Sequence, residues 1–421
     1  MPIAALLLVA CDTIETPVRG SEGSGATASG AVAFSVSEVQ AMSRAGFVGE
    51  LNELFMHATG FGVYAYVTTD GNTWATGGST KTPDFMLDEH VTYESTEGWV
   101  YRPLKYWPNQ ITEDIDRVSF FAYAPFVDID AVAYHDPDEA MTAAADPAFT
   151  GEGILSLPGE TSTGAPKIAY SVAKRPAFSV DLMYGVAAEE ASGLQGAVVS
   201  EGMPFLDMTK MQTGDCLDYR FCHALTRLMA YADVIDNDDE PVDFLNTKLV
   251  ISDIVLSGGQ VLYKRGVLNL QNTEANTPEW EGKAGVVGSM TDYMATTMRH
   301  TDEGKFTNTY FAHQPLGVST TEQSLFGLGV DGRTAAALMF IAGEPSAATP
   351  REWPLLTVTY HVIRRDGSEP FGYTDTEVTR EVKLKNVEFE PGETTVLRLH
   401  FDFNEKNPIL IVDSDKYTEQ W

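Results

Sequence analysis

Residues that could take part in catalysis or metal binding are scattered along this sequence without the spacings that such chemistry needs. The eight histidines have no pair at the separation of zinc ligands and stand at positions 57, 90, 135, 223, 300, 313, 361 and 400. Neither the Gly-x-Ser-x-Gly of serine hydrolases nor the His-Glu-x-x-His of zinc proteases occurs. We therefore predict that the chain is not an enzyme and holds no metal or cofactor. His223 lies in an aromatic stretch and is interpreted as a packed or hydrogen-bonded strand residue.

One glycine-rich stretch, Gly327-Leu-Gly-Val-Asp-Gly332, has the spacing of a dinucleotide-binding loop. Such a loop works between a strand and the N-terminus of a helix, where backbone amides meet the pyrophosphate. Here the segment that follows, 334–341, is short, and no alternation of strands and helices surrounds it. A glycine-rich hairpin is the better interpretation.

Acidic residues outnumber basic ones, with 60 Asp and Glu against 28 Lys and Arg and a net charge of -32. This balance argues against a nucleic-acid partner, which requires a basic surface to displace counterions. Two acidic loops, 128–139 and 236–240, are candidate calcium sites, but they lack the ligand order of an EF-hand and favour solvated loops. A carboxylate pair for glycoside hydrolysis stays open, because spacing in sequence does not give the distance between two groups.

A short alternation near the N-terminus predicts a strand with one apolar face. Val32, Phe34 and Val36 alternate with smaller residues, so their side chains point to the same side. A second apolar run follows at 61–67. Between the two runs lies Arg44, next to the small residue Ala45. The order of strand, basic site and strand indicates a first strand that proteolysis after Arg44 could remove.

The first eleven residues form an apolar run that ends at Cys11 and is too short to span a bilayer, which takes about 20 residues. Its last four residues resemble the processing motif of bacterial lipoproteins, which implies cleavage before Cys11 and lipidation of this cysteine. No Lys or Arg precedes the run, unlike in a usual signal, and an unprocessed apolar N-terminus is the alternative. Residues 12–30 are rich in Gly, Ser and Thr and are predicted to be a flexible tether, with Arg19 as a second basic site.

From residue 31 onward, short apolar or aromatic alternations are separated by Gly, Pro, Asn and Asp, which is typical of an all-β protein. We place a domain boundary between residues 210 and 211, giving an N-terminal domain over 31–210 and a C-terminal domain over 211–421. Ser257-Gly-Gly-Gln260 is interpreted as a hairpin turn between two strands. Cys216 and Cys222 are predicted to be buried thiols, because a strand would hold them too far apart for a disulfide.

Several of these stretches together resemble the fimbrillin family of Bacteroidales, the type V pilus subunits with Mfa-like and FimA-like branches. Their order covers the N-terminal half well, and the C-terminal half matches in general character. The stretches are Leu8–Cys11, Val32–Ser37, Ser43–Ala45, Phe61–Tyr66, Tyr106–Pro108, Val118–Pro125, Asp181–Met183 and Phe221–Arg227.

The resemblance implies two transthyretin-like β-sandwich domains in tandem and export as a lipidated precursor to the outer membrane and cell surface. An Arg-specific surface protease would cut between Arg44 and Ala45 and release the strand that carries Val32, Phe34 and Val36. Subunits would then join by β-strand addition. The candidate donor strand is formed by Ile409, Leu410, Ile411 and Val412, and an ordinary last strand is the alternative for these four residues.

We therefore expect a fimbrial structural subunit or fimbrillin-like adhesin, whose partners are other fimbrial subunits and ligands on host or bacterial surfaces. The main alternative is a glycan-binding surface lipoprotein that keeps its anchor at Cys11 and never polymerises. A hydrolase that uses two carboxylates is a third alternative. Cleavage after Arg44 separates the first hypothesis from the second.

Overall fold

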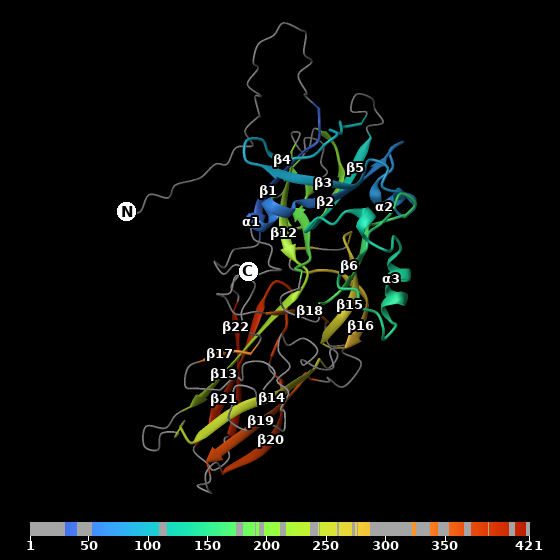
Figure 1. The fold of residues 1–421 in the computed structure, drawn as a ribbon. Helices are drawn as coiled ribbons and strands as arrows, with labels where there is room; N and C mark the ends of the chain where they lie inside the picture. The colour runs from blue at the N-terminus through green and yellow to red at the C-terminus, as the bar shows by residue number, and fades with distance from the viewer. Residues whose placement is uncertain are drawn as a thin grey trace, which may run out of the picture.

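A computed structural model gives the fold of the chain (Figure 1). It describes residues 30–39, 53–108, 116–173, 180–189, 191–192, 198–210, 216–235, 243, 245–258, 261–271, 274–275, 277–286, 322–325, 337–343, 353–365, 372–385, 387–403 and 409–417. Strands dominate these residues, which confirms the prediction of an all-β protein. The α-helices among them are short: α1 (Glu53–Thr59), α2 (Trp74–Gly77) and α3 (Pro137–Ala144). None of them is long and apolar enough to cross a membrane.

The first sheet has the strand order β1-β12-β8-β5-β2-β3-β4, with β11 paired to β5. All its pairs are antiparallel except the one between β1 and β12, which is parallel. The strands are β1 (Ala33–Val39), β2 (Phe61–Thr68), β3 (Met86–Glu94), β4 (Gly98–Val100), β5 (Arg117–Ala124), β8 (Met183–Ala187), β11 (Phe205–Met208) and β12 (Cys216–His223).

The second sheet has the order β22-β21-β13-β18-β15-β7-β6, with β16 paired to β15 and β17 to β13. Its strands are β6 (Gly153–Ser156), β7 (Lys167–Ser171), β13 (Thr226–Ile235), β15 (Leu262–Asn269), β16 (Trp280–Val286), β17 (Gln323–Ser324), β18 (Leu338–Ala342), β21 (Thr394–Asp402) and β22 (Ile409–Tyr417). A three-stranded sheet contains β14 (Thr247–Ser257), β19 (Leu355–Arg365) and β20 (Tyr373–Lys383), and a short pair contains β9 (Ala191–Ser192) and β10 (Val198–Val199).

Figure 1 shows the first sheet at one end of an elongated molecule and the β14-β19-β20 sheet at the other. Strand β2 explains how the first sheet joins the rest. Its residues Phe61, Val63 and Ala65 pack in one apolar cluster, whereas Tyr64 and Tyr66 pack in a second cluster that continues into the other sheets. A strand covered on both faces has a nearly continuous apolar sequence, as β2 has.

The pairing of strands crosses the predicted boundary between residues 210 and 211 in both directions. Strands β6 and β7, from the predicted N-terminal domain, lie in the second sheet, and β12, from the predicted C-terminal domain, lies in the first. The hairpin predicted at 257–260 is wrong. Strands β14 and β15 belong to different sheets, so this segment links two sheets, because a turn signal shows where a strand ends and not which strand it pairs with.

The prediction for His223 is confirmed. Its Nδ1 lies 2.5 Å from Oδ2 of Asp181, and both side chains are fully buried. Cys216 and Cys222 lie on the same strand, β12, and neither forms a disulfide. Cys222 is buried as predicted, whereas Cys216 is half-buried.

Candidate functional site

The predicted first strand, β1, lies at the edge of the first sheet. Its hydrogen-bonded neighbour in the described sheet is β12, and the register pairs Phe34 with Leu217 and Val36 with Tyr219. The two strands are about 180 residues apart in sequence, so β1 pairs with a strand from the middle of the chain. Loss of β1 would leave that edge of β12 unpaired.

The apolar face of β1 is buried. Val32 is 1% and Phe34 is 4% exposed, whereas Val36, farther along, is half-buried. The ring of Phe34 has four aromatic neighbours, with centroid separations of 5.4 Å to Tyr101, 6.0 Å to Tyr219, 6.1 Å to Phe120 and 6.2 Å to Phe61. The alternation in the sequence therefore marks the side of the strand that fills an aromatic groove.

The other face of β1 carries a polar contact. The hydroxyl of Ser35 donates a hydrogen bond of 2.7 Å to Oδ1 of Asp218 on β12, and the hydroxyl of Ser37 donates to the second oxygen of the same carboxylate. Ser35 also lies 3.2 Å from the sulfur of Cys216. The carboxylate of Asp218 thus accepts hydrogen bonds from two hydroxyls that are two residues apart. Residues at this spacing point to the same face of a strand.

The segment that follows β4 holds the start of β1. The amide of Val32 donates to the carbonyl of Lys105 at 2.9 Å, and the amide of Trp107 donates to the carbonyl of Gly30 at 3.0 Å. The buried hydroxyl of Tyr101 donates to the carbonyl of Val32 at 2.8 Å. Burial raises the pKa of Tyr101 to about 12, so its hydroxyl stays protonated as a donor.

Replacing Tyr101 with Phe is expected to lower the free energy of unfolding of the unprocessed chain by about 1–2 kcal/mol, because a buried carbonyl loses its donor. Denaturant unfolding measures the change. Tyr106→Phe in the same segment is the matched control, since Tyr106 is 54% exposed, and it should change stability by less than about 0.5 kcal/mol. Equal effects of the two variants would contradict a role of the Tyr101 hydroxyl in holding β1.

The candidate donor strand, β22, lies at one edge of the second sheet, and β6 lies at the other edge. Strand β22 pairs antiparallel with β21 over its whole length. Leu410 and Val412 are half-buried and pack against the core, whereas Ile409 and Ile411 are 47% and 39% exposed. Two large apolar side chains that point to solvent from an edge strand are available to a partner.

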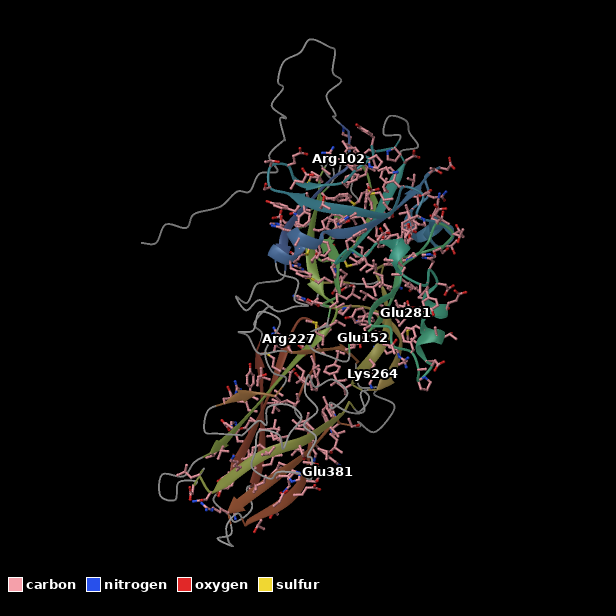
Figure 2. All side chains as sticks on the ribbon, in the orientation of Figure 1. Arg102, Glu152, Arg227, Lys264, Glu281 and Glu381 are labelled. Carbon is pink, nitrogen blue, oxygen red and sulfur yellow. The ribbon has the colours of Figure 1, made fainter. Side chains whose placement is uncertain are left out.

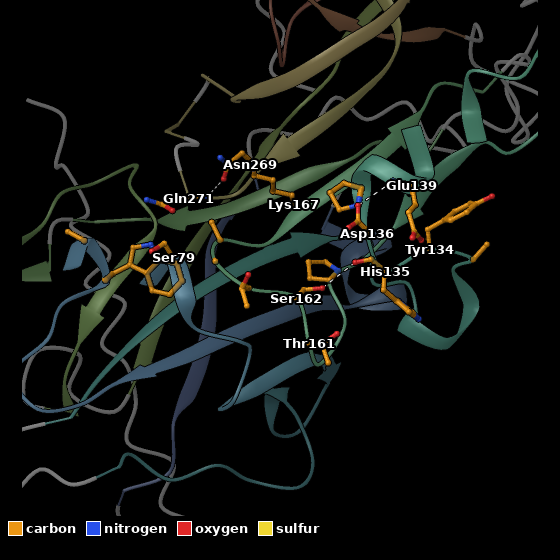
Figure 3. A pocket seen from close by; sticks show the side chains of 18 residues that line it. Ser79, Tyr134, His135, Asp136, Glu139, Thr161, Ser162, Lys167, Asn269 and Gln271 are labelled. Atoms are coloured by element: carbon orange, nitrogen blue, oxygen red, sulfur yellow. Dashed lines mark hydrogen bonds between the residues drawn. The ribbon is translucent and has the colours of Figure 1, made fainter. Parts of the chain in front are cut away.

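A polar hollow of about 810 Å³ lies beside α2, the start of α3, and strands β7 and β15 (Figure 3). This volume is within the range of small-molecule sites. Its lining is rich in hydroxyl, amide and charged groups and includes Tyr134, His135, Asp136, Ser162, Lys167, Asn269 and Gln271.

The two acidic loops have a structural explanation where the structure describes them. Asp128 accepts a hydrogen bond from the amide of Asp130, and Asp136 caps α3 by accepting from the amides of Asp138 and Glu139. Residues 236–240 lie outside the described residues. Within the described ranges, no three His, Cys, Asp or Glu side chains gather as a metal site would require.

No protein-family model matches the chain. Fimbrium subunit Fim1C of Phocaeicola vulgatus is 24% identical to it over 337 residues, which cover 79% of this chain and 75% of Fim1C. A crystal structure of a fimbrial protein from Bacteroides vulgatus superposes with a TM-score of 0.59 at 20% identity, over 92% of this chain and all of that one. The chain is thus similar in sequence to a fimbrium subunit and in fold to a fimbrial protein.

The similarity to the B. vulgatus structure shows a shared fold. The fimbrial anchor protein Mfa2 from Porphyromonas gingivalis also aligns over 92% of this chain and 96% of its own, at 8% identity, but its TM-score of 0.30 is too low to support an argument. The sequence similarity to Fim1C agrees with the fimbrillin resemblance of the sequence.

Of the predicted site residues, the structure places Phe34 and Val36 on β1 and Val32 directly before it, and the four residues from Ile409 lie on β22. Cys11, Arg44 and Ala45 lie outside the described residues. Sequence reasoning missed Tyr101 and Asp218, which bind β1 from far along the chain. The pair of serines at 35 and 37 was the local signal that pointed to a polar partner.

Proposed function

We propose that the chain is a fimbrial subunit, exported as a lipoprotein with its lipid on Cys11, cut after Arg44 at the cell surface, and assembled by strand addition between subunits. The single observation that supports this most is the position of β1. An edge strand with a buried apolar face lies directly before the proposed cut, since Arg44 follows the last residue of β1, Val39, by five positions.

Removal of β1 would create a surface that a partner can complete. The edge of β12 would present unpaired backbone amides and carbonyls, and the aromatic groove around Phe34 would lose its occupant. An extended strand of another subunit could pair with the edge of β12 through main-chain hydrogen bonds and fill the groove with its apolar side chains. While β1 is in place, it keeps the groove filled and prevents early polymerisation.

Strand β22 is the candidate donor. Its exposed Ile409 and Ile411 stand two residues apart, as Val32 and Phe34 do on β1, so they match the spacing of the groove. Before it could be donated, β22 would have to leave β21, with which it forms a continuous ladder. An ordinary last strand of the second sheet remains the alternative, and other subunits would then supply the donor.

The test is proteolysis of the purified full chain with an Arg-specific protease, followed by N-terminal sequencing and a size measurement. We expect a new terminus at Ala45 and, after cleavage, species larger than the monomer. Arg44→Ala should remain monomeric, whereas Arg19→Ala is the matched control and should still be cut at Arg44 and assemble. Cleavage at Ala45 that never changes the size of the protein would contradict assembly by this route.

A second candidate function is a glycan-binding surface lipoprotein that keeps its anchor. The observation that favours it is the polar hollow, whose hydroxyl and amide groups suit a polyhydroxylated ligand. Material from the cell surface would then begin at Cys11, and treatment with the protease would never produce a terminus at Ala45. Under both hypotheses, the fimbrial subunit and the glycan-binding lipoprotein, the protein acts at the cell surface on ligands of host or bacterial surfaces.

A further inference from the structure

Three polar side chains from adjacent strands meet beside the polar hollow. Lys167 on β7 lies directly opposite Asn269 on β15 in the antiparallel ladder, and Glu281 comes from β16 on the other side of β15. The Nζ of Lys167 donates to Oε2 of Glu281 at 2.7 Å, and Nδ2 of Asn269 donates to Oε1 of the same carboxylate at 2.8 Å. Lys167 and Asn269 line the hollow in Figure 3, and Glu281 lies near α3 in Figure 2.

The surroundings of this group are partly closed to water. Asn269 is 6% exposed, whereas the side chains of Lys167 and Glu281 are 38% and 39% exposed. Ala169 and Val267, two positions along β7 and β15 from Lys167 and Asn269, are buried in a small apolar cluster with residues of α3. The helix therefore covers the strands immediately beside the three polar side chains.

The carboxamide oxygen of Asn269 has its own donor. The backbone amide of Gln271 donates to Oδ1 of Asn269 at 3.1 Å, a contact drawn in Figure 3. A fixed N–H group aimed at a carbonyl oxygen stabilises the negative charge that forms there when a nucleophile adds to the carbon. The amide of Asn269 is thus held between a carboxylate at its nitrogen and a donor at its oxygen.

The Glu281 carboxylate contacts both the amine nitrogen of Lys167 and the amide nitrogen of Asn269. Replacing the amide nitrogen with the amine nitrogen requires such a group, because a proton must move from one to the other. The amine of Lys167 must lose a proton to become a nucleophile, and the nitrogen of Asn269 must gain one to leave as ammonia. Glu281 lies within hydrogen-bond distance of both. We propose that Lys167 and Asn269 form an intramolecular amide cross-link, with Glu281 carrying the proton between them.

The reaction balances without any co-reactant. Glu281 takes a proton from Lys167, and the lone pair of Nζ forms a bond to Cγ of Asn269, while the electrons of the C=O bond move to Oδ1 beside the Gln271 amide. Glu281 then gives the proton to Nδ2, the Cγ–Nδ2 bond breaks, and the C=O bond re-forms. Of the three protons on the Lys167 ammonium group, one reaches Nδ2 through Glu281, a second leaves with the ammonia as ammonium, and the third stays on the new amide nitrogen. No atom is oxidised or reduced.

The ionisation of Glu281 supports this role. Burial alone would raise the pKa of the Glu281 carboxyl, but the hydrogen bonds from Lys167 and Asn269 and the charge of Lys167 outweigh it and lower the pKa. The carboxylate is therefore ionised and able to accept the first proton.

The cross-link would join β7 to β15 and close a loop that contains β8 to β14. That loop includes β12, the strand that forms one wall of the β1 groove. A pulling force on the two ends of the chain would pass through the cross-link, so the strands between residues 167 and 269 would not unravel. This inference does not depend on the proposed function, because the bond forms within one chain.

Intact-mass measurement and tryptic mapping of the folded full chain test the cross-link. We expect a branched peptide that joins Lys167 to Asn269 and is about 17 Da lighter than its two parts together, because ammonia is lost. Glu281→Gln should give two separate peptides of full mass, and so should Lys167→Arg. Glu201→Gln, which removes the carboxylate of a surface ion pair with Arg220, is the matched control and should keep the branched peptide.

The wild-type chain alone decides the proposal, so a variant that fails to fold leaves it testable. Two separate peptides of full mass after one week at pH 8 would overturn it. A loss of about 17 Da in the Asn269 peptide alone would also overturn it, since that mass reports an internal succinimide and not a bond to Lys167.

Discussion

Phe34→Ala is expected to lower the free energy of unfolding of the unprocessed chain by about 3–5 kcal/mol. Phe34 is 4% exposed, and its ring contacts Phe61, Tyr101, Phe120 and Tyr219. Truncation would leave a cavity among these rings, which lie on β2, β5 and β12 and directly after β4 and cannot all close around it. Denaturant unfolding of the full chain measures the loss.

Val36→Ala is the matched control on the same face, because Val36 is half-buried, and it should cost about 1 kcal/mol or less. The comparison extends to the processed protein. Once β1 has been released, Phe34→Ala should have no effect on the stability of what remains. A loss of stability in the unprocessed chain that is no larger for Phe34→Ala than for Val36→Ala would contradict the burial of Phe34 in the aromatic groove.

Asp88→Asn is expected to remove a pH dependence of stability between about pH 4 and pH 7. Asp88 on β3 is 7% exposed, and its Oδ1 accepts a 2.7 Å hydrogen bond from Tyr123. Burial raises the pKa of its carboxyl from 3.8 to about 7, an effect that the bond from Tyr123 reduces. The folded chain therefore binds a proton in this range that the unfolded chain has already lost.

This extra proton in the folded state decides whether stability rises or falls with pH. Because the folded state binds more protons than the unfolded state between these two pKa values, the contribution of Asp88 to stability falls as pH rises through the window and stays low above it. The loss amounts to at most about 4 kcal/mol for a pKa difference of about three units. Asp88→Asn should therefore match the wild type near pH 4 and be more stable than it at pH 8.

Thermal unfolding at several pH values from 4 to 8 checks this expectation. Asp70→Asn is the matched control, since Asp70 also has a positive φ, of 58° against 47° for Asp88, but is exposed on a turn. Its curve should run parallel to that of the wild type. An Asp88→Asn variant that is less stable than the wild type at pH 8 would show that the charged carboxylate contributes to the fold.

The sequence by itself determined the strands and their buried faces. Val32 and Phe34 point into the core and Ala33 to solvent, as the alternation predicted, because a period of two holds for any strand whatever its partner. The apolar run at 61–67 predicted β2 by a different signal, since a strand that is covered on both faces is apolar at nearly every position. The all-β class followed from many such short runs separated by turn residues.

Only the tertiary structure decided which strands are neighbours. Strand β1 pairs with β12 in parallel and β13 pairs with β21 in parallel, and local periodicity carries no information about either partner. The hairpin predicted at 257–260 was wrong for this reason. Strand pairing also crosses the predicted boundary at residue 210, because segments on each side of it contribute to both sheets.

The contacts of the polar side chains also depend on which distant strands are neighbours. Tyr101 and Asp218 bind β1 because β4 and β12 lie beside it, and Glu281 contacts both Lys167 and Asn269 because β15 separates β7 from β16. Each of these residues is ordinary in its own sequence context. The sequence therefore determined which face of the first strand is buried, whereas the packing of distant strands determined what that face and the neighbouring polar groups contact.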